Sequence, residues 1–285
     1  MRRIVFPLVF AVLFSTSLFG TALAQQQAAA ATDLPPAPQD PQAVAVLNQA
    51  IAVAGGAQAL GAVRDYTAAG NVTYHRDQGD QDVQGTVTII GQGASRVRLD
   101  ASLPTGVRSW AILRGQTTRK TTDGKISQLP PPKGRVIPSS DALPYHAPMF
   151  PGGLVFPYLE LVAALNNPSY AVSYKGLVQL DGRSAYDIQV ERVMPSSATA
   201  KAPASPYDLK DYFIDASTSQ VLMTQETVPK FVVHRIRYSD YRPVGGVLAP
   251  FSISEELGGQ HTWDIELNQI GFNSGVRDSA FVLAN

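Results

Sequence analysis

The sequence predicts a mainly β protein of the α+β class, in which a curved antiparallel sheet has one apolar face. One observation is the C-terminal alternation of apolar with other residues, which places the apolar ones on a common strand face. These residues are Val247, Ala249, Phe251 and Ile253, followed by Trp263, Ile265 and Leu267. The other observation is the turn signals between the alternating segments, such as the glycine pair at 258–259, which are typical of hairpins.

The first 24 residues have the pattern of a secretory signal peptide. A basic start precedes an apolar stretch at 4–19 and an Ala-Leu-Ala site, so cleavage is expected after Ala24. A membrane-spanning helix is the alternative, but the apolar stretch is short for one. We expect a periplasmic or secreted protein that does not span the membrane after cleavage. Residues 25–39, rich in Ala, Gln and Pro, predict a disordered tether, and residues 40–285 a single domain.

The composition excludes several kinds of site. The chain has no Cys, so disulfides, a thiol nucleophile, thiolate metal sites and a lipid-modified Cys are excluded. Without Arg2 and Arg3, the 23 basic residues fall to 21, against 23 acidic ones. Such a balance argues against nucleic acid as a partner.

The domain is expected to begin with a helix and to continue as strands. Asp40 and Pro41 form an N-cap and first helical residue, and apolar residues then recur at helical spacing up to the glycines at 55–56. From residue 63 the period changes to two. The strand candidates are residues 66–74, 83–89, 95–101, 107–113, 170–174 and 186–190.

A Pro-rich and helical insert at 129–168 interrupts the strands. Its helix is predicted to start at Pro157 and to end near Asn166. Four residues form its apolar stripe: Tyr158, Leu161, Val162 and Leu165. A loop of this length and apolarity indicates either a cap on one end of the core or a movable lid over a pocket.

Catalytic and metal motifs are missing from the sequence. There is no G-x-S-x-G elbow, H-E-x-x-H pair or Walker loop. The histidines, His75, His146, His234 and His261, lack ligand spacing, although neighbouring strands could bring His234 and His261 together. Glu255 and Glu256 are adjacent in a strand and must point to opposite faces. We therefore expect no catalytic residue, no metal and no cofactor.

The C-terminal part resembles the periplasmic outer-membrane lipoprotein-sorting superfamily, which has the LolA/LolB-like fold. A strand at 212–215 precedes residues 238–250, YSDYRPVGGVLAP, and a strand at 263–269 precedes an ending with Phe272, Asn273, Asp278 and Phe281. Strands of that superfamily often have a "dyrpvdGv.lP" turn and close with an "i..N..i.d..F" run. The resemblance implies a curved, unclosed antiparallel β-barrel covered by the N-terminal helix and the mid-chain helix.

The resemblance also implies a function. In that superfamily the apolar inner face holds acyl chains of lipoproteins or senses lipids. The expected function is a non-catalytic carrier or binding module for an apolar ligand or a lipidated protein. A protein-interaction or envelope-stress sensor domain is the alternative, a hydrolase comes third, and the oligomeric state is open. The ligand-cavity candidates are Phe156, Tyr158, Leu161, Val162, Leu165, Phe251, Ile253, Trp263 and Ile265. Arg235 and Arg237, on one strand face, are candidates for a head-group contact, or for ordinary surface ion pairs.

Overall fold

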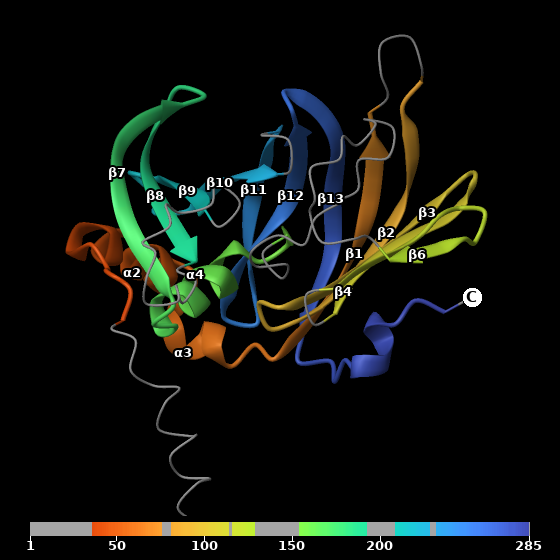
Figure 1. Ribbon diagram of the computed structural model, residues 1–285, viewed down its shortest axis with the longest axis horizontal. Coiled ribbons are helices and arrows are strands. Elements are labelled where there is room, and N and C mark those ends of the chain that lie inside the picture. Colours follow the sequence, from red (N-terminus) through yellow and green to blue (C-terminus); the bar gives the residue numbers. More distant parts are fainter. Residues whose placement is uncertain are drawn as a thin grey trace, which may run out of the picture. The chain divides into compact units, whose positions relative to one another are not determined.

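The strands form one open antiparallel sheet. The computed structural model describes residues 36–75, 81–113, 116–128, 154–192, 209–228 and 232–284. Within these ranges, 13 strands are ordered β6-β5-β4-β3-β2-β1-β13-β12-β11-β10-β9-β8-β7, and the two outermost strands are not paired with each other. The sheet is strongly curved (Figure 1). The predicted mainly β class and the curved, unclosed barrel are therefore confirmed.

The sheet consists of two halves that meet at one long-range pair. The N-terminal half contains β1 (Asp65–Tyr74), β2 (Val83–Gln92), β3 (Arg96–Leu103), β4 (Gly106–Leu113), β5 (Gln116–Lys120) and β6 (Ile126–Gln128). The C-terminal half contains β7 (Tyr170–Leu180), β8 (Arg183–Arg192), β9 (Leu209–Asp215), β10 (Val221–Val228), β11 (Val232–Val244), β12 (Val247–Leu257) and β13 (Gln260–Phe272). Every strand pair joins neighbours in sequence except the pair of β1 with β13, where Tyr74 is opposite Trp263, and β6 and β7 form the two edges.

The predicted apolar face is the buried face of the sheet. All seven alternating residues of β12 and β13 are buried, and we call this side of the sheet the core face. The cross-strand neighbours on β1 and β2 are buried too, and together they form one continuous apolar cluster. The alternation therefore predicted correctly which side of these strands is removed from water.

The N-terminal helix begins and ends where its sequence signals predict. Helix α2 (Pro41–Val53) is capped by Asp40, whose carboxylate accepts a hydrogen bond from the Gln42 amide at 2.8 Å. Gly55 follows with φ +115, and a Cβ there would lie 2.3 Å from the Gly246 carbonyl oxygen, so only glycine fits. A second short helix, α3 (Gly56–Gly61), was not predicted.

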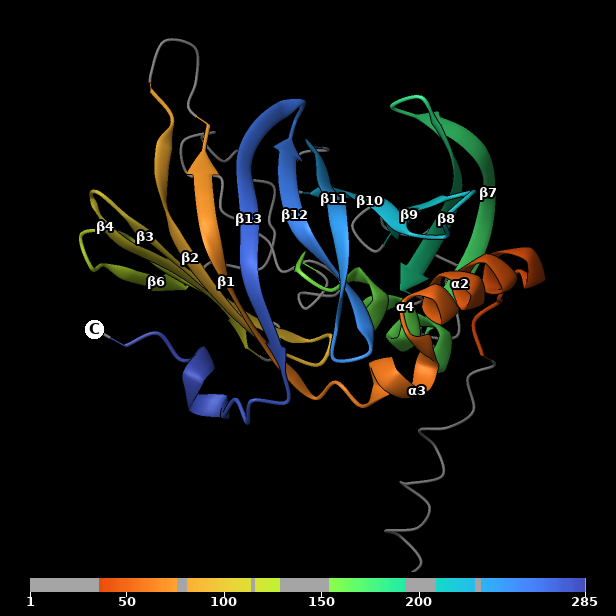
Figure 2. The same cartoon turned by 180° about the vertical axis from the view of Figure 1, so that it is seen from behind.

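The mid-chain helix α4 (Pro157–Asn166) has the predicted bounds. It packs against α2, α3, β7 and β10, and α3 also contacts β12. These three α-helices are thus grouped beside the C-terminal half of the sheet (Figure 2), whereas the short 3-10 helix η4 (Asp278–Phe281) contacts β3 and β4. None of the helices in the described ranges is long and apolar enough to cross a membrane.

Backbone hydrogen bonds link the residues just before Asp40 to the start of β7 and to the segment just before that strand. The Ala37 amide donates to the Pro168 carbonyl at 2.8 Å, and Gln39 forms a parallel bridge with Val172 of β7. The Val172 amide donates to the Pro38 carbonyl at 3.1 Å and the Asp40 amide donates to the Val172 carbonyl at 2.8 Å, so the end of the predicted tether uses backbone groups that the edge strand β7 exposes. The predicted signal peptide, tether residues 25–35 and insert residues 129–153 lie outside the described residues.

Candidate functional site

The predicted ligand-cavity residues meet in one cluster. On α4 and just before it, Phe156, Tyr158 and Leu161 are fully buried, whereas Val162 and Leu165 are half-buried. The four strand candidates are also buried: Phe251, Ile253, Trp263 and Ile265. All nine belong to the continuous apolar cluster or pack against it. Their role in holding a ligand stays a prediction.

Aromatic contacts join the start of α4 to the core face. The Phe156 ring lies 5.8 Å from the Tyr66 ring and 5.0 Å from the Phe272 ring, centroid to centroid. The Tyr158 hydroxyl accepts a hydrogen bond from the Val221 amide at 3.3 Å. Tyr241 donates to the Val221 carbonyl at 2.7 Å. The helix is therefore held by strands from both sides of the β1–β13 seam.

A charged pair is buried beneath α4. Glu160 is fully buried, and its carboxylate accepts hydrogen bonds from the Lys210 ammonium at 2.8 and 3.1 Å and from the Tyr212 hydroxyl at 2.6 Å. Burial raises the pKa of Glu160, while Lys210 and Tyr212 oppose that rise. Burial also raises the pKa of Tyr212 well above its usual value, so this phenol is a donor at neutral pH. The pair ties the helix to β9.

This pair was not predicted from the sequence, although a signal was present. Lys210 alternates with Asp211 and therefore shares a strand face with Tyr212 and Ile214, a buried pattern into which a lysine fits only with a partner. Glu160 lies in the first turn of α4. Six residues of this helix are buried, and the other five are not acidic. One acidic residue in the buried pattern of α4 and one basic residue in the buried pattern of β9 together indicate an ion pair.

A second buried network surrounds a histidine. His234 Nδ1 lies 3.0 Å from a Glu226 carboxylate oxygen, and Nε2 lies 2.8 Å from one of Glu255. Thr262 donates to the other Glu255 oxygen. Burial lowers the pKa of His234, but the hydrogen bonds to the two carboxylates outweigh it and raise the pKa to about 9. The imidazole is therefore charged at neutral pH, with a carboxylate at each nitrogen.

We expect the stability of the protein to fall as the pH rises from 6.5 to about 9. The folded state binds the His234 proton more tightly than the unfolded chain does, so the stabilisation is complete below the unfolded pKa of about 6.5 and is lost as pH passes the folded value of about 9. The shift corresponds to roughly 3 kcal/mol. Urea unfolding at pH 6 and at pH 9.5 measures it.

The matched control for this pH dependence is His234→Gln, which removes the titrating group. Its free energy of unfolding should change much less between the two pH values than that of the wild type. Equal slopes for the two proteins would contradict the assigned role of His234.

The remaining polar candidates lie on different sides of the sheet. His234 is buried, whereas His261 is exposed on β13, so the structure does not bring these two histidines together. Glu255 is buried and Glu256 is not, as their adjacency predicted. Arg235 pairs with Glu256 at 2.6 Å, and Arg237 pairs with Asp181. Both arginines alternate with buried residues of β11, so any head-group contact by them would be on the outer face.

Three buried donors on side chains of the apolar cluster have no acceptor within the described part of the chain. They are the indole Nε1 of Trp110, the indole Nε1 of Trp263 and the hydroxyl of Tyr74. Their side chains are between 0% and 8% exposed, and all belong to the apolar cluster. Because nearly all buried donors in proteins are paired, such groups indicate a place for an acceptor.

The fold is shared with solved structures, although no family model and no curated protein matches the chain. A LolA superfamily protein from Nitrosomonas europaea is 9% identical with a TM-score of 0.52, and the match covers 85% of this chain and 97% of that one. A DUF1329 family protein from Desulfovibrio piger is 11% identical with a TM-score of 0.51, covering 84% and 97%. At these identities the likeness concerns the fold. The arrangement predicted from the C-terminal motifs is confirmed: the chain has a LolA/LolB-like fold.

Proposed function

We propose that the chain is a non-catalytic periplasmic carrier or binding module for an apolar ligand, either a lipid or the acyl chain of a lipoprotein. The observation that carries the proposal is the core face itself, which is apolar and yet contains the donors of Trp110, Trp263 and Tyr74, for which the described residues supply no acceptor. A molecule with a long apolar chain and one group of acceptor oxygens matches both properties. The LolA/LolB-like fold and the signal-peptide pattern support the same function and location.

The buried histidine supports a role without catalysis. Both nitrogens of His234 are within hydrogen-bond distance of carboxylates, and its raised pKa keeps it protonated at neutral pH. A general base must be unprotonated and must reach its substrate. His234 is protonated and both its nitrogens are engaged, so it is not a candidate general base for the hydrolase considered from the sequence.

A protein-interaction or sensor domain is the second candidate. The contacts of α4 favour it, because the Glu160–Lys210 pair and the Tyr158 hydrogen bond fix the helix against the core face. A helix fixed in this way fills the interior, which leaves binding to an outer surface or a sheet edge.

We expect delipidated protein to take up one long-chain fatty acid per chain. Trp263→Phe keeps an aromatic ring but removes the indole donor, so it should weaken palmitate binding by about fivefold, the value of one hydrogen bond. The affinity for hexadecane, which has no acceptor, should stay unchanged and serves as the control ligand. Fluorescent-probe displacement measures both affinities.

Hydrogen exchange separates the two candidates. A carrier should show altered protection of residues 154–166 when palmitate is added, because the ligand and α4 contact the same core face. Absence of uptake, together with unchanged exchange in this segment, would contradict the carrier and favour the interaction domain.

A further inference from the structure

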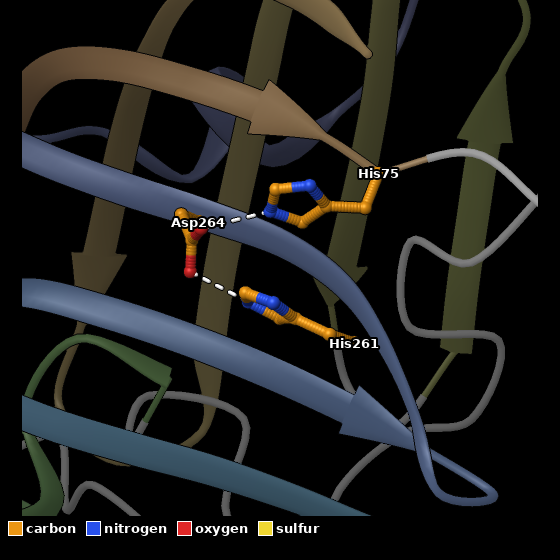
Figure 3. Close-up of side chains that lie close together, drawn as sticks. All are labelled: His75, His261 and Asp264. Carbon is orange, nitrogen blue, oxygen red and sulfur yellow. Dashed lines mark hydrogen bonds and ion pairs between the residues drawn. The ribbon is translucent and has the colours of Figure 1, made fainter. Parts of the chain in front are cut away.

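Three side chains with metal-binding atoms gather where β1 meets β13, on the face opposite the core (Figure 3). His75 follows the last residue of β1, whereas His261 and Asp264 belong to β13. His75 Nε2 lies 2.8 Å from one carboxylate oxygen of Asp264, and His261 Nε2 lies 2.7 Å from the other. The three ligand atoms all lie within 4.8 Å of one another. We propose that this cluster binds a divalent transition-metal ion such as Zn²⁺.

A β-bulge brings the two β13 ligands to the same face. In a regular strand, residues three apart point to opposite faces. On β12, however, Glu255 pairs with Trp263 and the next residue, Glu256, pairs with His261, so Thr262 is an extra residue on β13. Thr262 and Trp263 are both buried, while His261 and Asp264 face outward. Bulges often redirect side chains at functional sites, and this one creates the cluster.

The ligand set selects the class of ion. Two imidazole nitrogens and one carboxylate suit Zn²⁺, Cu²⁺ or Ni²⁺, whereas Ca²⁺ and Mg²⁺ prefer oxygen ligands alone. Ligand atoms around a tetrahedral zinc ion are about 3.3 Å apart, so the present contacts need only a small expansion. The His261 side chain is 53% exposed, which leaves a coordination position for water.

Asp82 supplies the outer contact that metal-binding histidines usually have. Its carboxylate lies 3.0 Å from His75 Nδ1, on the other side of the ring from Asp264. A hydrogen bond there places the proton on Nδ1 and leaves the Nε2 lone pair for the metal. The same carboxylate also fixes the orientation of the ring.

The test measures Zn²⁺ binding by the chelator-treated full chain through competition with a zinc indicator, and Co²⁺ binding through its visible absorption. We expect one ion per chain and a higher melting temperature with zinc. Asp82→Asn should lower zinc affinity by about tenfold. His75→Gln, His261→Gln and Asp264→Asn should each lower it by more than this.

Asp181→Asn is the matched control, because it neutralises an exposed carboxylate on the β7–β8 turn, outside the cluster. Circular dichroism without metal checks that every variant is folded. If Asp264→Asn does not fold, His261→Gln still tests the proposal, because the His261 side chain is exposed. Equal zinc affinity in the wild type and in His261→Gln would overturn the proposal. So would an equal loss in Asp181→Asn and His261→Gln.

Discussion

Lys210→Met is expected to destabilise the folded protein by about 3–5 kcal/mol, because it leaves a buried carboxylate without its cation. Glu160 is fully buried and its side chain pairs with Lys210 at 2.8 Å. Methionine preserves most of the volume of lysine, so the loss reports the charge rather than a cavity. Urea unfolding followed by circular dichroism measures the difference.

Two controls separate the buried pair from an ordinary surface pair. The double variant Glu160→Gln/Lys210→Met keeps an acceptor for the Tyr212 hydroxyl and removes both charges, so it should be more stable than Lys210→Met alone. Arg237→Met breaks the more exposed pair with Asp181 and should cost less than about 1 kcal/mol. If Lys210→Met costs no more than Arg237→Met, the pair does not stabilise the fold.

Trp263→Ala is expected to cost about 3–5 kcal/mol, because it opens a cavity in the centre of the sheet. Trp263 is fully buried and lies between Tyr74 of β1 and Glu255 of β12, at the seam that joins the two halves. Chemical denaturation measures the loss. Val107→Ala, at a side chain that is 48% exposed, should change stability by less than about 0.5 kcal/mol. A cost below about 1 kcal/mol for Trp263→Ala would mean that this side chain is not in the core.

The sequence was sufficient for the parts of the fold that depend on local patterns. Alternation assigned the buried side of β12 and β13, and the N-cap residue Asp40 and the first-turn proline Pro157 predicted where two helices begin. Each of these features depends on residues that are close together in the chain, so one segment contains the whole signal.

The polar sites could not be predicted in the same way, because their members are distant in sequence. Glu160 and Lys210 are 50 residues apart, and His75 and Asp264 are 189 apart. A lone charge in an apolar pattern gives no indication of its partner until the strand register is known. The bulge at Thr262 is a further obstacle, because strict alternation assigns His261 and Asp264 to opposite faces.

The pairing of β1 with β13 has a consequence for how the chain folds. All other strand pairs join neighbours in sequence, so each half can form early from hairpins that close short loops. The seam closes a loop of about 190 residues, which costs roughly 3 kcal/mol more in chain entropy than a hairpin turn. Docking of the two preformed halves is therefore expected to be the slow step. Until it occurs, both apolar faces and the seam edges of β1 and β13 are exposed, and this intermediate is the species on which chaperones and proteases would act.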